Sequence, residues 1–207
     1  MGIYSLGILK NRFDVVLLLD GSSSLGIARF LQTLSLAKDV LSPYNISREN
    51  TNVAAAVYAY NTTIHFNLTQ YFSYAAVSSA IDLIPYLDQS PTNLSLAMES
   101  VNRTIISSSR ENVTVVIVVF VTTALSGNCP VCQTLREQGV KIITVGVGED
   151  VVDSQLVSIA TNPEEDFVVI FPFLHIFTMS GVVSGAIAQG KRFVPLAVLL
   201  IAIIILL

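Results

Sequence analysis

Unbroken runs of apolar residues alternate along the chain with segments in which apolar residues recur every three or four positions. The runs are typical of strands buried on both faces of a sheet, and the spaced segments are typical of helices with one buried face. Strands are predicted at residues 15–19, 53–60, 63–68, 113–121, 140–147 and 167–171. Helices are predicted at residues 25–41, 71–84, 94–107, 129–138, 152–160 and 174–188. This alternation predicts an α/β fold with a doubly wound, mostly parallel, Rossmann-like sheet.

Two features of the pattern refine this sheet. Asn61 and Thr62 join the second predicted strand to the third, and so short a join predicts a hairpin. The sheet is therefore expected to have one antiparallel edge strand. The run at residues 113–121, VTVVIVVFV, is the most hydrophobic strand and is expected at the centre.

The first strand ends in a group of side chains that carry oxygen atoms. Its apolar run stops at Asp20, Gly21 lets the chain turn, and Ser22 and Ser24 follow at alternate positions. Open α/β sheets bind their ligands beyond the carboxyl ends of the strands. One carboxylate and two hydroxyls at that place suit a hard cation such as Mg²⁺. The plainer interpretation is a strand end at which Asp20 caps the next helix.

Residues 13–26, FDVVLLLDGSSSLG, resemble the metal-ion-dependent adhesion site of von Willebrand factor A domains. Ser90-Pro91-Thr92-Asn93 before a helix and the strand that ends TVGVG at Gly148 also match the family. The resemblance implies an A-type domain over residues 13–188 that acts in adhesion or recognition. It also implies that Thr92 joins Asp20, Ser22 and Ser24 around Mg²⁺ or Mn²⁺, and that an acidic residue of a protein ligand fills the open position of the ion.

One position departs from the family pattern. The family usually has Thr-Asp-Gly after the central strand, and its Asp completes the site. This chain has Val121-Thr122-Thr123-Ala124, so Thr123 stands where the Asp is expected. Losing a carboxylate removes a negative charge, which predicts weak or ligand-assisted cation binding. The alternative is a structural or assembly domain with a degenerate site that binds partners without metal.

Charge and glycosylation motifs indicate where such a domain works. The 207-residue chain has a net charge of −4 and no run of Lys and Arg, which argues against nucleic-acid binding. Six N-x-[ST] motifs favour a secreted or cell-surface glycoprotein over a cytosolic chain rich in Ser, Thr and Asn. Their acceptors are Asn45, Asn61, Asn67, Asn93, Asn102 and Asn112. Asn93 has a second interpretation, as the cap of the helix that begins at Leu94.

Cys129 and Cys132 are the only cysteines, in the order C-P-V-C. In an extracellular protein this spacing favours a short local disulfide near the Thr123 loop. Free thiols, redox-active thiols and metal-binding thiols are the alternatives. One C-x-x-C without a second Cys or His pair is too little for a zinc site.

The residues expected of an enzyme are not in place. The histidines, His65 and His175, are interpreted as structural, with His65 facing solvent from the edge strand. A nucleophile elbow G-x-S-x-G at residues 21–25 is broken by Leu25. Gly146-Val147-Gly148 lacks the third glycine of a dinucleotide-binding loop. We therefore expect a binding protein and no enzymatic activity.

Residues 189–207 form a hydrophobic tail in which Lys191 and Arg192 precede FVPLAVLLIAIIILL. A helix over residues 193–207 would reach about 22 Å, short of a hydrocarbon core of roughly 30 Å. The small residues around Ser184 favour a GPI-attachment signal, with a membrane span as the alternative. Residues 1–9 are apolar but lack the basic residues of a signal peptide. We expect a domain attached to the outer cell surface through its C-terminus.

Overall fold

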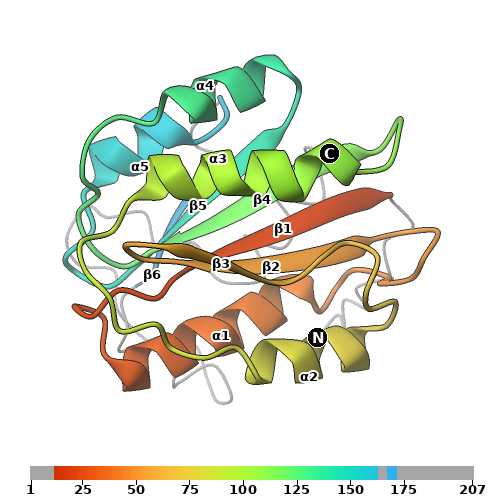
Figure 1. The fold of residues 1–207 in the computed structure, drawn as a ribbon, viewed down its shortest axis with the longest axis horizontal. Coiled ribbons are helices and arrows are strands. Elements are labelled where there is room, and N and C mark those ends of the chain that lie inside the picture. The colour runs from red at the N-terminus through yellow and green to blue at the C-terminus, as the bar shows by residue number, and fades with distance from the viewer. Residues whose placement is uncertain (1–11, 163–166, 172–207) are drawn as a thin grey trace, which may run out of the picture.

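The computed structural model describes residues 12–162 and 167–171, which form a six-stranded sheet with helices on both faces (Figure 1). The strands are β1 (Phe13–Asp20), β2 (Asn52–Tyr58), β3 (Thr62–Phe66), β4 (Thr114–Val121), β5 (Lys141–Val147) and β6 (Val168–Phe171). The helices are α1 (Ile27–Leu41), α2 (Tyr74–Asp82), α3 (Leu94–Thr104), the 3₁₀ turn η1 (Ile106–Ser108), α4 (Pro130–Glu137) and α5 (Asp153–Ile159). The predicted helix at residues 174–188 and the tail at 189–207 lie outside the described residues.

The strand order is β3-β2-β1-β4-β5-β6, and every neighbouring pair is parallel except β2 and β3. This confirms the doubly wound fold, the antiparallel edge strand and the inner place of β4. Because β1, β2, β4 and β5 run the same way, they all begin at one edge of the sheet and all end at the other. These are called the amino edge and the carboxyl edge below.

The core lies on both faces of the sheet. Helices α1 and α2 cover one face, and α3, α4 and α5 cover the other (Figure 1). Along β1, Leu17 and Leu19 belong to the cluster under α1, whereas Val16 and Leu18 belong to the cluster under α3. Both sets are buried, which is why this strand is an unbroken apolar run rather than an alternation.

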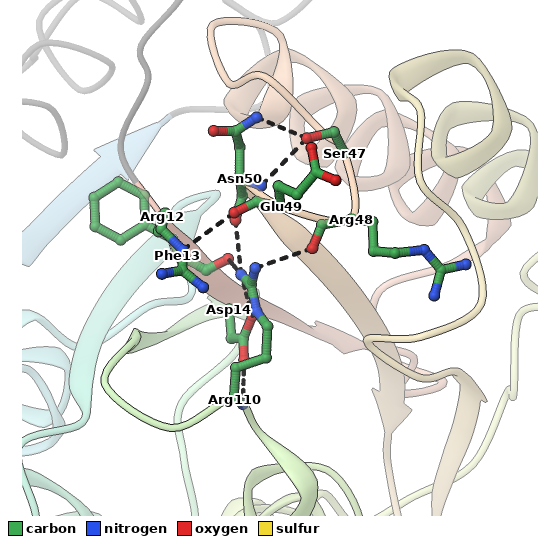
Figure 2. Close-up of polar contacts among 8 residues, drawn as sticks. All are labelled: Arg12, Phe13, Asp14, Ser47, Arg48, Glu49, Asn50 and Arg110. Atoms are coloured by element: carbon green, nitrogen blue, oxygen red, sulfur yellow. Dashed lines mark hydrogen bonds and ion pairs between the residues drawn. The ribbon is translucent and has the colours of Figure 1, made fainter.

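A buried ion pair fastens the amino edge (Figure 2). Asp14 is fully buried near the start of β1, and the Nε of Arg110 donates to its Oδ1 at 2.8 Å. The same guanidinium donates to the carbonyl oxygens of Phe13 and Asn50 through Nη2, and to that of Arg48 through Nη1. Arg110 thus joins the start of β1 to the loop before β2. Sequence reasoning missed this cluster.

His65 is a correction to the sequence analysis. It lies in the edge strand β3, as predicted, but it is half-buried rather than turned to solvent, and burial lowers its pKa. Its Nε2 is buried without a hydrogen-bond partner among the described residues. The expectation that His65 faces solvent came from the edge position of β3, and the burial of its Nε2 shows that it was wrong.

A candidate metal-ion site at the carboxyl edge

Asp20, the last residue of β1, is fully buried and held by three hydrogen bonds. Its Oδ1 accepts from the backbone N–H of Ser22 at 2.9 Å. Its Oδ2 accepts from the hydroxyl of Thr122 at 2.6 Å and from the backbone N–H of Thr122 at 3.3 Å. Helix α1 begins after Gly26 with no side-chain cap, so the interpretation of Asp20 as a helix cap is wrong. The three donors fix the carboxylate in one orientation.

The two serines converge next to this carboxylate, in the loop of residues 21–25, called the serine loop below. The Oγ atoms of Ser22 and Ser24 lie 3.1 Å apart. Ser22 is almost completely buried, whereas Ser24 is exposed. A backbone hydrogen bond from Leu25 to the carbonyl of Ser22 closes the turn at 3.1 Å. The structure therefore brings Asp20, Ser22 and Ser24 together, with Ser24 on the exposed side of the serine loop.

The connection between α2 and α3 supports the serine loop from the side. The hydroxyl of Tyr86 donates to the carbonyl of Ser22 at 2.7 Å and accepts from the N–H of Gly26 at 3.1 Å. Burial is the main cause that raises the pKa of Tyr86, which keeps its phenol protonated and able to donate. The N–H of Ser23 donates to the carbonyl of Gln89 at 2.9 Å. Neither Tyr86 nor Gln89 was found from the sequence, because both act across more than 60 residues of chain.

Thr92 and Thr123 lie on the two loops that flank the serine loop at the carboxyl edge. Thr92 is half-buried, and its carbonyl accepts from the hydroxyl of Ser126 at 2.7 Å. Thr123 is also half-buried, but the residue that bonds to Asp20 is its neighbour Thr122. Asn93 caps α3, since its Oδ1 accepts from the N–H of Leu96 at 3.0 Å. An amide nitrogen that carries a glycan leaves this oxygen free to cap.

The loop after β4, residues 122–129, is held in its middle and at its end. The side chain of Gln155 in α5 donates to the carbonyl of Leu125 and accepts from its N–H, both at 2.8 Å. At its end Cys129 and Cys132 are joined by a disulfide across the first turn of α4. This loop, which carries Thr122 and Thr123, is thereby fixed against both α5 and the Thr92 loop.

The residues at this edge fit a weakly held hard cation. They offer one carboxylate and several hydroxyls, and the described residues contain no group of three or more His, Cys, Asp or Glu that could hold a metal. A buried acceptor also lacks a partner here: the Oε1 of Gln89, beside the serine loop. An oxygen-only set with a single carboxylate suits Mg²⁺ or Mn²⁺ better than a soft metal.

The chain belongs to the von Willebrand factor type A domain family, whose model matches residues 14–173. Cuticlin-6 of Caenorhabditis elegans is 30% identical over 158 residues, which cover 75% of this chain and 27% of that protein. Mouse vitrin is 33% identical over 76 residues, which cover 37% of this chain and 12% of that protein. The chain thus spans only a small part of these relatives.

Two structures of proximal thread matrix protein 1 from the mussel byssus have the same fold. One of them, with a zinc-occupied MIDAS motif, is 24% identical with a TM-score of 0.73, and the other is 22% identical with a TM-score of 0.72. In both cases the match covers 82% of this chain and 44% of that chain.

Proposed function

We propose that the domain is an extracellular adhesion or recognition module that binds an acidic residue of a protein ligand through a divalent cation at the carboxyl edge. Asp20, Ser22 and Ser24 would hold the ion, with Thr92 and Thr123 contributing from the flanking loops. The bound ion would supply an electrophilic position for the carboxylate of the partner. The convergence of the two serine hydroxyls beside the oriented carboxylate of Asp20 carries the proposal.

Neighbouring residues of the chain would hold the ligands of the ion in position. Thr122 and the N–H of Ser22 hold Asp20 in place, so the carboxylate loses little conformational freedom when an ion binds. Tyr86 fixes the serine loop in the same way. Ser24 is exposed, so a partner could approach the site from its side.

Electrostatics at this edge support a metal-dependent mode of binding. The exposed acidic residues Glu149, Asp150 and Asp153 follow β5, and Asp88 is exposed next to Gln89. An acidic partner would be repelled by this edge unless a cation lies between them. Binding of such a partner should therefore depend strongly on metal.

One observation supports a second candidate function. The three donors to Asp20 all come from the chain itself, and they satisfy the hydrogen-bonding needs of its carboxylate. An A domain with this edge could bind a basic partner directly and serve in assembly without metal. The same acidic residues that repel an acidic partner would attract a basic one.

We infer a binding role rather than an enzymatic one, because the hydroxyls of Ser22 and Ser24 pair with each other and not with a general base.

A cell-surface location is part of the proposal. Asn61, Asn67, Asn93 and Asn112 are exposed and accessible to glycosylation, and Asn45 and Asn102 are partly so. Within the described residues no helix is long and apolar enough to cross a membrane. Attachment through residues 189–207 would be tested by release with a phosphatidylinositol-specific phospholipase.

Calorimetric titration of Mg²⁺ and Mn²⁺ into the full chain tests the metal-dependent function. We expect saturable binding that is lost in Asp20→Ala. Asp150→Ala is the matched control, because it removes the same charge from an exposed position at the same edge. Equal losses in both variants, or no binding to the parent protein, would contradict the metal site and favour the metal-independent alternative.

A further inference from the structure

The Oε1 of Gln89 is buried and has no hydrogen-bond partner among the described residues. A buried acceptor without a partner is costly, and native structures seldom keep one without a reason such as a bound ion or water. Four other side chains in the described part of the chain have such an atom: Gln32, Tyr44, Asn52 and His65. Among the hydrogen bonds of the described residues, none joins these four residues to the serine loop, whereas the backbone carbonyl of Gln89 accepts from that loop.

The position of Gln89 relative to the serines is set by the backbone. Its carbonyl accepts from the N–H of Ser23 at 2.9 Å, and Gln89 and Ser22 form an isolated parallel β-bridge. Bridged backbones lie roughly 4.8 Å apart. A glutamine side chain, with two methylene groups before its amide, is long enough to span that separation. Gln89 therefore lies directly beside Ser22, with a side chain long enough to extend toward the serine hydroxyls.

The site also lacks an oxygen ligand that the family usually has. Thr123 stands at the position of the second carboxylate, so a cation would have one carboxylate and hydroxyls only. Amide carbonyl oxygens are common ligands of hard cations. We propose that the Oε1 of Gln89 is a further oxygen ligand of the divalent cation held by Asp20, Ser22 and Ser24. The proposal rests on the metal-dependent function proposed above.

This role sets the charge as well as the number of the ligands. A glutamine supplies an oxygen without restoring the negative charge that Thr123 leaves out. The site then binds its cation weakly but leaves more of the ion's charge for the carboxylate of a partner. Gln89→Glu would reverse this balance, because it places a second carboxylate beside Asp20.

The experiment is a calorimetric titration of Mn²⁺ into the full chain and its variants, together with thermal unfolding in Mn²⁺ and in chelator. Gln89→Leu removes the oxygen and keeps a side chain of similar length, and we expect it to weaken Mn²⁺ binding about tenfold. Gln89→Glu should strengthen binding by a similar factor. Gln138→Leu is the matched control, since this exposed glutamine lies beyond the end of α4, at the amino edge, and should leave binding unchanged.

Thermal unfolding separates loss of a ligand from loss of the fold. In chelator, Gln89→Leu should unfold no earlier than the parent protein, because an apolar group replaces a buried acceptor without a partner. In Mn²⁺ its midpoint should rise less than that of the parent.

The outcomes distinguish this inference from the function on which it rests. If the parent binds Mn²⁺, Asp20→Ala does not, and Gln89→Leu binds as the parent does, the metal site stands and the role of Gln89 is overturned. A buried water on the Oε1 would then explain its burial. If the parent itself binds no Mn²⁺, both proposals fail together.

Discussion

Strand β1 carries two fully buried aspartates, and the two edges of the sheet treat them differently. At the amino edge Asp14 is paired with the guanidinium of Arg110. At the carboxyl edge the three hydrogen bonds found for Asp20 among the described residues come from neutral donors, the hydroxyl and N–H of Thr122 and the N–H of Ser22. Neutral donors orient a carboxylate but leave its net charge in place. The chain thus supplies a cationic partner for the buried aspartate at the amino edge and neutral donors for the one at the carboxyl edge, where the proposed cation would add the positive charge.

The largest effect on the free energy of unfolding is expected from breaking the ion pair between Asp14 and Arg110. Arg110→Met leaves Asp14 buried without its cation and removes three hydrogen bonds to backbone carbonyls. We expect the free energy of unfolding to fall by about 3–5 kcal/mol, measured by urea denaturation at pH 7. Added Mn²⁺ should not restore the loss, because the proposed cation site lies at the opposite edge of the sheet.

Two variants control this measurement. Arg103→Met removes an exposed arginine from the last turn of α3 and should change the free energy of unfolding by about 0.5 kcal/mol or less. The double variant Asp14→Ala, Arg110→Met should lose less than Arg110→Met alone, because no charge remains buried without a partner. A double variant that loses more would show that packing, and not the ion pair, stabilises this edge.

A smaller effect on stability is expected from removing one hydrogen bond to Asp20 at the carboxyl edge. Thr122→Val removes the hydroxyl that donates to Asp20 and keeps the shape of the side chain. We expect a loss of about 2 kcal/mol in the free energy of unfolding, the usual size for a hydrogen bond to a charged group. Unlike the loss in Arg110→Met, part of it should be recovered in saturating Mn²⁺, which supplies charge to the same carboxylate.

Thr122→Ser is the matched control for Thr122→Val, because it keeps the hydroxyl and removes only the methyl group. It should stay close to the parent protein in chelator and in Mn²⁺. If Thr122→Val stays as stable as the parent protein while Thr122→Ser loses stability, the hydroxyl contributes nothing and the methyl group decides the stability.

The arrangement at the carboxyl edge was largely predictable from the sequence, and the ion pair at the amino edge was not. Asp20, Ser22 and Ser24 lie within five residues, directly after a strand that the apolar run defines, so local pattern alone brings them together. Arg110 lies 96 residues from Asp14, and no local pattern joins them. A charge at the start of a strand predicted to be buried does signal that a partner must exist.

The same limit applies to the residues that follow β4. The family pattern singled out Thr123 as the position of the missing carboxylate, but it did not indicate that Thr122 would bond to Asp20 across 102 residues. Which of the two adjacent threonines bonds to Asp20 depends on the path of the backbone after β4. The apolar pattern gives no information on that path, because it ends with the strand. Tyr86 and Gln89 were missed for the same reason, since their contacts with the serine loop are set by tertiary packing.

The smallest effect is expected from adding a second carboxylate at the carboxyl edge. Thr123→Asp places a second carboxylate on the loop that flanks the serine loop, and we expect Mn²⁺ binding to tighten about tenfold, because affinity for hard cations rises with the charge of the ligands. In chelator the same variant should be less stable than the parent, since two carboxylates then repel each other near the same edge. Asn128→Asp, an exposed position on the same loop, measures the effect of charge alone. Equal tightening in both variants would mean that Thr123 does not face the ion, and that general attraction to the acidic edge accounts for binding.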